Sequence, residues 1–181
     1  ESYARCPFTF YLESVLDIKP RPEVEEDLTP GDKGTLFHRI AGRFYSELRS
    51  EGSTRFTEAQ LDLMTERILR IGQEELGRYD LDGPAWEAFR STVMGFGARK
   101  GLLRAFLENE AKNRSAFEPK FFELSFGSPL DDGFDASSWE EPAAIDLGEE
   151  ELKLRGRIDR VDVLPDGRFA VIDYKTGRST P

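Results

Sequence analysis

Two segments with the composition of β-strands, joined by a Pro-Asp-Gly turn, lie near the C-terminal end of this 181-residue sequence. They cover residues 153–164 and 168–175 and are rich in β-branched and alternating polar residues. Between them, Pro165 suits the first turn position and Gly167 suits a left-handed one. The sequence therefore predicts a β-hairpin.

The predicted hairpin brings charged side chains together. If its loop has three residues, Asp159 faces Asp173 across the strands, and Lys175 lies on the same face as Asp173. Cross-strand Cβ atoms are about 5 Å apart, so two carboxylates there repel each other unless a cation lies between them. Mg²⁺ prefers such oxygen ligands. The pattern predicts a metal site; the alternative is a surface hairpin whose charges are solvated.

The hairpin contains the motifs G-R-I-D-R-V-D, from residue 156, and D-Y-K-T-G, from residue 173. Together they resemble the RecB/AddB-like branch of the PD-(D/E)XK nuclease superfamily. The resemblance implies that Asp159, Asp173 and Lys175 are catalytic. It also implies that both aspartates and the backbone carbonyl of Tyr174 bind the metal, while Lys175 orients or activates the attacking water.

Two upstream residues match further motifs of this branch. His38, the single histidine of the chain, ends G-T-L-F-H at the start of an amphipathic helix. The resemblance adds it to the metal ligands, and imidazole with carboxylates suits Mn²⁺ as well as Mg²⁺. Glu123 fits the spacing P-x-x-x-E-x-x-F. It either supports the metal site or is a strand carboxylate that faces solvent.

Cys6 lies in the segment C-P-F-T-F and is the single cysteine. This segment resembles the entry of AddB-type nucleases, where the cysteine ligates an iron–sulfur cluster. One thiolate cannot hold a cluster. Cys6 is therefore either a buried structural residue or an iron–sulfur ligand of a longer parent protein, and a cluster is expected only in such a protein.

The charge of the chain is unevenly distributed. The formal net charge is −10, but ten of the 35 acidic residues lie between residues 121 and 152, where Lys and Arg are absent. From Lys153 onward, basic residues outnumber acidic ones, which suits a phosphate backbone. Within this region, we expect DNA contacts from Arg157, Arg160 and Arg178.

The rest of the sequence predicts helices followed by strands. The expected elements are a loop at 19–32, helices from residue 34, at 57–77 and at 84–109, strands at 117–126 and 144–147, and a mobile acidic loop at 131–141. Phe122 and Glu123 are expected on opposite faces of their strand. We expect a single α/β domain, with a helical part at 1–116 and a β-rich nuclease core at 117–181. The resemblance implies a restriction-endonuclease-like core with a central mixed sheet, incomplete because the family continues beyond the D-Y-K motif.

The resemblance also implies the function. It indicates a Mg²⁺- or Mn²⁺-dependent deoxyribonuclease of the exonuclease type, which hydrolyses phosphodiester bonds at single- or double-stranded DNA ends. Such a domain belongs to a helicase–nuclease for double-strand-break repair and recombination, with a helicase domain or subunit as partner. A cytoplasmic location is expected, since no apolar run is long enough to cross a bilayer. One alternative is a catalytically inactive nuclease-like module that binds DNA or serves as a scaffold. The other is an enzyme acting on small phosphates, although the sequence has no glycine-rich phosphate loop.

Overall fold

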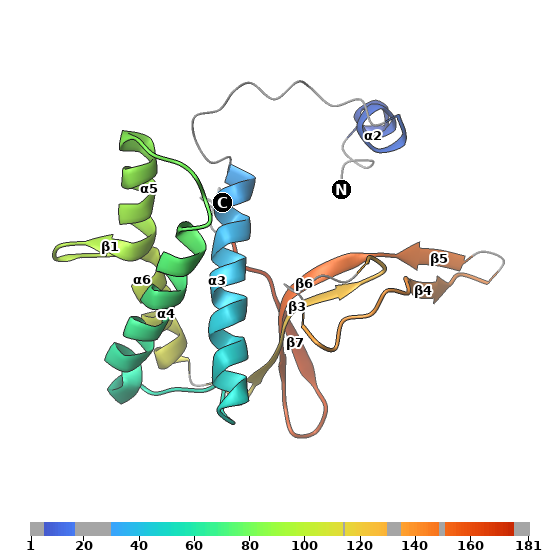
Figure 1. Cartoon of the computed structure of the whole chain (residues 1–181). Coiled ribbons are helices and arrows are strands. Elements are labelled where there is room, and N and C mark those ends of the chain that lie inside the picture. Colours follow the sequence, from blue (N-terminus) through green and yellow to red (C-terminus); the bar gives the residue numbers. More distant parts are fainter. Residues whose placement is uncertain (1–5, 17–29, 114, 130–134, 149–150, 176–181) are drawn as a thin grey trace.

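A long helix, α3 (Pro30–Ser50), lies between a group of helices and a three-stranded sheet (Figure 1). The computed structural model describes residues 6–16, 30–113, 115–129, 135–148 and 151–175. The chain combines helices with antiparallel sheets in an α/β arrangement, consistent with a restriction-endonuclease-like fold. Because of this position, α3 packs against both the other helices and the three-stranded sheet.

The helices precede the three-stranded sheet in the chain. Besides α3 they are α2 (Pro7–Phe10), η1 (Tyr11–Val15), η2 (Glu58–Gln60), α4 (Leu61–Leu76), α5 (Pro84–Met94) and α6 (Leu102–Lys112). The strands are β1 (Gly95–Phe96), β2 (Arg99–Lys100), β3 (Glu118–Phe126), β4 (Ala143–Asp146), β5 (Glu151–Leu154), β6 (Gly156–Val163) and β7 (Phe169–Ile172). Among the described residues, no helix has the length and apolar character needed to span a membrane.

The apolar stripe of α3 forms the centre of the core. Leu36, Ile40 and Phe44 recur at helical spacing and are buried in one core cluster with residues of α4, α5 and α6. The helix starts at Pro30, so the prediction of a loop up to residue 32 was wrong at its end. Proline suits the first turn of a helix, where its missing N–H has no intrahelical partner. Residues 17–29 lie outside the described residues.

The predicted continuous helix at 84–109 was wrong. It is divided at Gly95, where the chain forms the β1–β2 hairpin before α6 begins at Leu102. Gly95 has a φ of +91°, and a Cβ there would lie 2.7 Å from the Arg99 carbonyl oxygen. The apolar periodicity hid this break because α5 and α6 both bury side chains in the same core, including Val93 and Leu103.

The main sheet has the antiparallel strand order β3-β6-β7. The predicted hairpin register is confirmed: Leu164 N–H donates to the Arg168 carbonyl at 2.8 Å, and Arg160 pairs with Ile172. β7 ends at Ile172, so the expected strand up to residue 175 was too long. The first predicted strand is also divided, because β5 pairs with β4, whereas β6 pairs with β3.

The predicted alternation of side chains along β3 was wrong at Glu123. Phe122 and Glu123 are both buried, and both lie against α3, where Phe122 stacks on Tyr45 at a centroid distance of 4.7 Å. Glu123 has a φ of +52°, the only positive value at a non-glycine residue in the described part of the chain. This backbone conformation interrupts the strand geometry, so two successive side chains reach the same helix.

The acidic segment after β3 is partly ordered, contrary to the predicted mobile loop. Asp135 is buried and accepts hydrogen bonds from Arg49 at 2.7 Å and from the N–H of Phe122 at 3.1 Å. Trp139 stacks on Phe126 with 5.5 Å between ring centroids. Residues 130–134 of this segment lie outside the described residues. The short strand expected at 144–147 is present as β4, one residue earlier.

Candidate metal centre

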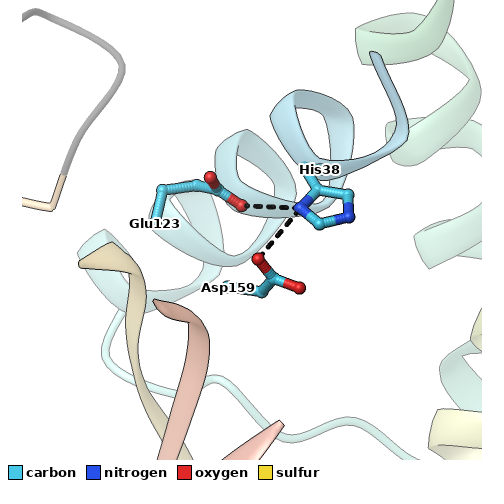
Figure 2. Close-up of side chains that lie close together, drawn as sticks. All are labelled: His38, Glu123 and Asp159. Carbon is cyan, nitrogen blue, oxygen red and sulfur yellow. Dashed lines mark ion pairs between the residues drawn. The ribbon is translucent and has the colours of Figure 1, made fainter. Parts of the chain in front are cut away.

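Three side chains from three elements converge beside the first turns of α3 (Figure 2). His38 comes from α3, Glu123 from β3 and Asp159 from β6. The His38 Nδ1 atom lies 3.1 Å from Asp159 Oδ1 and 3.7 Å from Glu123 Oε1. One potential ligand atom from each residue lies within 4.8 Å of the other two. These residues form the candidate metal centre.

The backbone explains why Glu123 reaches this centre. Its left-handed conformation turns the side chain toward α3, and the register of β3 with β6 sets residue 123 opposite residue 159. One helical turn after His38, Gly42 leaves room for the approach: a Cβ there would lie 3.1 Å from Glu123 Cγ. The facing pair of carboxylates is thus Glu123 and Asp159.

The buried Glu123 carboxylate is only partly compensated. Burial raises the pKa of Glu123, and the nearby charge of Asp159 raises it further, whereas Arg157 and His38 lower it. The Arg157 Nε atom lies 3.2 Å from Glu123 Oε2. Among the described residues, Glu123 Oε1 is buried without a hydrogen-bond partner. A buried acceptor with no donor is costly, so this oxygen is available as a ligand for a cation.

The orientation of the imidazole strengthens this interpretation. His38 Nε2 lies 3.2 Å from the carbonyl oxygen of Tyr174, an acceptor. If Nε2 carries the proton and donates to this carbonyl, the Nδ1 lone pair faces the two carboxylates. Three electron-rich atoms facing one another are stable only if a cation or a proton lies among them.

Tyr174 connects the D-Y-K segment to this centre. Its backbone N–H donates to Asp159 Oδ2 at 2.7 Å, and its carbonyl lies beside His38. Its ring packs edge-on against Phe37, His38 and Phe106. The resemblance had implied this carbonyl as a metal ligand, and the structure places it next to the imidazole.

Asp173 and Lys175 lie at the edge of the centre. The Asp173 Oδ2 and Lys175 Nζ atoms form an ion pair at 2.7 Å, with side chains 57% and 80% exposed. The backbone register sets Asp173 opposite Asp159, one position beyond the last pair of β7, but its carboxylate is not part of the three-residue cluster. Its role as a ligand stays a prediction.

The three arginines expected at DNA have different locations. Arg157 is partly exposed beside Glu123, whereas Arg178 lies outside the described residues. The prediction for Arg160 was wrong, because its side chain is 1% exposed and is held by acidic and aromatic partners inside the protein. Asp162, two positions later in the same motif, binds it with both oxygens.

The donor set fits a hard divalent cation. Mg²⁺ and Mn²⁺ take oxygen and imidazole ligands, and neighbouring ligands of an octahedral ion with bonds of about 2.1 Å lie about 3 Å apart. The separation of 3.1 Å between His38 Nδ1 and Asp159 Oδ1 agrees with this spacing. The buried, unpartnered oxygen of Glu123 is a third donor at the same place.

The fold and this cluster describe an α/β protein with a candidate metal centre of the kind found in hydrolases. The chain belongs to the PD-(D/E)XK nuclease superfamily, whose family model matches residues 1–181.

Several curated relatives are similar over almost the whole chain. Proteins named as a subunit of an ATP-dependent helicase/deoxyribonuclease are 32% identical over 182 residues in Acetivibrio thermocellus, 30% over 185 in Lacticaseibacillus casei and 31% over 186 in Clostridium novyi. These alignments cover 97% to 98% of this chain. The chain spans 15% of the length of each relative, so it corresponds to one part of those proteins.

Proposed function

We propose that the protein is a Mg²⁺- or Mn²⁺-dependent deoxyribonuclease of the exonuclease type, which acts within a helicase–nuclease for double-strand-break repair and recombination. The observation that carries the proposal is the convergence of His38, Glu123 and Asp159 beside the D-Y-K segment. Membership in the nuclease superfamily and the names of the relatives support the reaction class and the assembly.

His38, Glu123 and Asp159 would hold the metal, with Asp173 as a further ligand. The Tyr174 carbonyl, which the resemblance adds to the ligands, lies on the Nε2 side of the His38 ring. A bound divalent ion polarises the scissile phosphate and lowers the pKa of a coordinated water. The pairing of Asp159 Oδ2 with the Tyr174 N–H leaves Oδ1 directed toward His38. The carboxylate thus has one oxygen for the backbone and one for the ion.

Lys175 has a separate role in the proposal. Its ammonium group is exposed beside Asp173, at the end of the segment that Tyr174 anchors. There it orients the attacking water by hydrogen bonding and offsets the negative charge that develops on the phosphate oxygens. Asp173 holds this ammonium at the edge of the centre at 2.7 Å.

DNA is the proposed substrate, bound through its backbone near the metal centre. Arg157 and Arg178 supply local positive charge, but the net charge of the chain is −10. Charge alone therefore gives weak binding, and a helicase domain or partner subunit supplies most of the DNA affinity. We place the protein in the cytoplasm, where bacterial DNA is located.

Cys6 adds a second, structural cofactor to the proposal. It is partly buried just before α2, where its carbonyl accepts a hydrogen bond from the Phe10 N–H at 3.0 Å. An iron–sulfur cluster with Cys6 as one ligand needs three further ligands from outside this sequence. Iron analysis and the visible absorption spectrum of the full-length protein, compared with those of its Cys6→Ser variant, test this ligand.

The test of the nuclease function uses the full-length protein that contains this chain. Linear end-labelled DNA and closed circular DNA are incubated with Mg²⁺, Mn²⁺ or a chelator. We expect loss of the linear substrate with Mg²⁺ or Mn²⁺ and none with the chelator. Asp159→Asn should abolish this cleavage, whereas Asp146→Asn, at an exposed position, should not. Binding without cleavage under all conditions would instead establish the inactive DNA-binding module.

A further inference from the structure

Arg160 is the most completely buried charged side chain of the nuclease motif, and its guanidinium contacts four residues. Its Nε and one terminal nitrogen donate to the two oxygens of Asp162 at 2.6 and 2.7 Å. The other terminal nitrogen donates to Glu110 at 2.9 Å, to the Tyr45 hydroxyl at 3.0 Å and to the Tyr174 hydroxyl at 3.3 Å. This nitrogen therefore joins α3, α6 and the segment after β7.

The charges in this network are largely compensated. Asp162 binds Arg160 in the planar two-bond geometry that gives strong and directional ion pairs. Glu110 adds a second carboxylate and also accepts a hydrogen bond from the Tyr45 hydroxyl at 2.7 Å. A buried guanidinium with these partners is held in one position.

Tyr174 links this network to the metal centre. Its hydroxyl is held by Arg160, while its backbone N–H and carbonyl lie at Asp159 and His38. Strand pairing between β6 and β7 ends at Arg160 and Ile172, immediately before the D-Y-K segment. Side-chain contacts of Tyr174 therefore hold this segment where ladder hydrogen bonds have ended.

We propose that Arg160 is a positioning residue that acts through Tyr174 to hold the D-Y-K segment against the metal centre. The guanidinium fixes the outer end of the tyrosine, and the rigid ring transmits this constraint to the backbone that contacts Asp159 and His38. Asp173 and Lys175 flank this tyrosine, so their positions depend on it. The catalytic consequence rests on the proposed nuclease function, whereas the structural consequence does not.

Two tyrosines give a matched test, because both hydroxyls bind the same nitrogen of Arg160. Tyr174→Phe and Tyr45→Phe each remove one hydroxyl and keep the aromatic ring, so both variants should fold. Tyr45 lies on α3 and stacks on Phe122, whereas Tyr174 belongs to the D-Y-K segment. A general loss of stability would appear in both variants, and a loss of positioning would appear in Tyr174→Phe alone.

Hydrogen exchange of the full-length protein without metal is the primary measurement. In Tyr174→Phe, amide exchange in peptides that cover residues 172–176 should become about tenfold faster, because one hydrogen bond to a buried charge is lost. Tyr45→Phe should change these peptides less than twofold. Arg160→Lys, which loses the two-bond pair with Asp162, should behave like Tyr174→Phe. Equal exchange at 172–176 in Tyr174→Phe and the parent would overturn the proposal.

Kinetics and Mn²⁺ titration then separate the positioning role of Arg160 from the proposed nuclease function. If the parent cleaves DNA, Tyr174→Phe should lower kcat about tenfold with little change in the KM for DNA, since the positions of reacting groups change and DNA contacts do not. Unchanged kcat would overturn the catalytic consequence of positioning. If the parent binds no Mn²⁺ and cleaves no DNA, the nuclease proposal fails, and the exchange result still decides whether Arg160 positions the segment.

Discussion

The backbone N–H of Tyr174 donates a hydrogen bond of 2.7 Å to Asp159 Oδ2, while Oδ1 of the same carboxylate lies 3.1 Å from His38 Nδ1. One carboxylate thus joins the two motifs of the hairpin to the helix that carries the histidine. The candidate metal centre is the meeting point of three elements that are far apart in the sequence.

Mn²⁺ should stabilise the folded protein through Asp159. A ligand that binds only the folded state, at a concentration ten times its Kd, adds about 1.4 kcal/mol to the free energy of unfolding. The Tm should therefore rise with millimolar Mn²⁺. Asp159→Asn should abolish this rise. Without metal it should be more stable than the parent by about 1 kcal/mol, because the amide can accept from Tyr174 and donate to His38 Nδ1. Thermal unfolding with Asp146→Asn as control checks both effects; a lower Tm of Asp159→Asn without metal would show that the carboxylate crowding is absent.

Glu123→Gln should stabilise the metal-free protein at neutral pH. Burial and the charge of Asp159 raise the pKa of Glu123, so its ionised form costs free energy in the folded state. Removing this charge should raise the Tm by about 2–4 °C in the presence of a chelator, which corresponds to about 1 kcal/mol. The exposed Glu118→Gln on the same strand should have no effect. A lower Tm for Glu123→Gln would mean that the ion pair with Arg157 outweighs burial.

The contact between Asp135 and Arg49 should make the protein sensitive to acid. Burial alone would raise the pKa of Asp135, but the N–H of Ser137, the guanidinium of Arg49 and the N–H of Phe122 outweigh it and hold the pKa below its usual value. A lowered pKa gives stability that is fully present above the unfolded value of about 3.9 and is lost as the pH falls through the folded value.

Asp135→Asn provides the measurement for this contact. The variant should lose about 1–2 kcal/mol of unfolding free energy at pH 7, and the difference from the parent should shrink at pH 3. Urea unfolding at both pH values checks this prediction, with Asp62→Asn, at an exposed position, as control. An equal difference at pH 3 and pH 7 would exclude the ionised carboxylate as the cause.

Lys175→Ala should separate metal binding from cleavage. The side chain lies at the edge of the centre and is proposed to act on water and phosphate, so Mn²⁺ affinity should stay within about twofold while kcat falls about a hundredfold. Calorimetric Mn²⁺ titration and single-turnover cleavage by the full-length protein measure the two effects. Lys153→Ala, an exposed lysine on β5, is the matched control. Full cleavage by Lys175→Ala would remove this residue from the mechanism.

The sequence predicted the hairpin and its register because a three-residue loop and the period of two along a strand are local properties. Three short motifs also pointed to His38, Asp159 and Tyr174, which the structure brings together, while their roles at a metal stay predictions. The division of the helix at Gly95 was missed, because apolar side chains on both sides pack into one core and keep the helical period. The glycines at positions 95, 97 and 101 were the sequence sign of this break.

The positions of Glu123 and Arg160 were less predictable. Alternation along a strand assumes an ordinary backbone, whereas Glu123 has a positive φ that the sequence does not signal. Arg160 was assigned to DNA because basic residues outnumber acidic ones from Lys153 onward, but its partners Tyr45 and Glu110 come from distant helices. The carboxylate of Asp162, at an i+2 position on the same strand, was the local sign of an internal ion pair.

The backbone of Glu123 has a consequence for protein engineering. A left-handed conformation at a non-glycine residue costs about 1–3 kcal/mol, and Glu123→Gly would relieve both this strain and the buried charge. A library screened for thermal stability alone is therefore expected to enrich glycine at position 123. Its most stable members would have lost a carboxylate of the candidate metal centre. A screen for stable variants should therefore measure metal affinity as well as thermal stability.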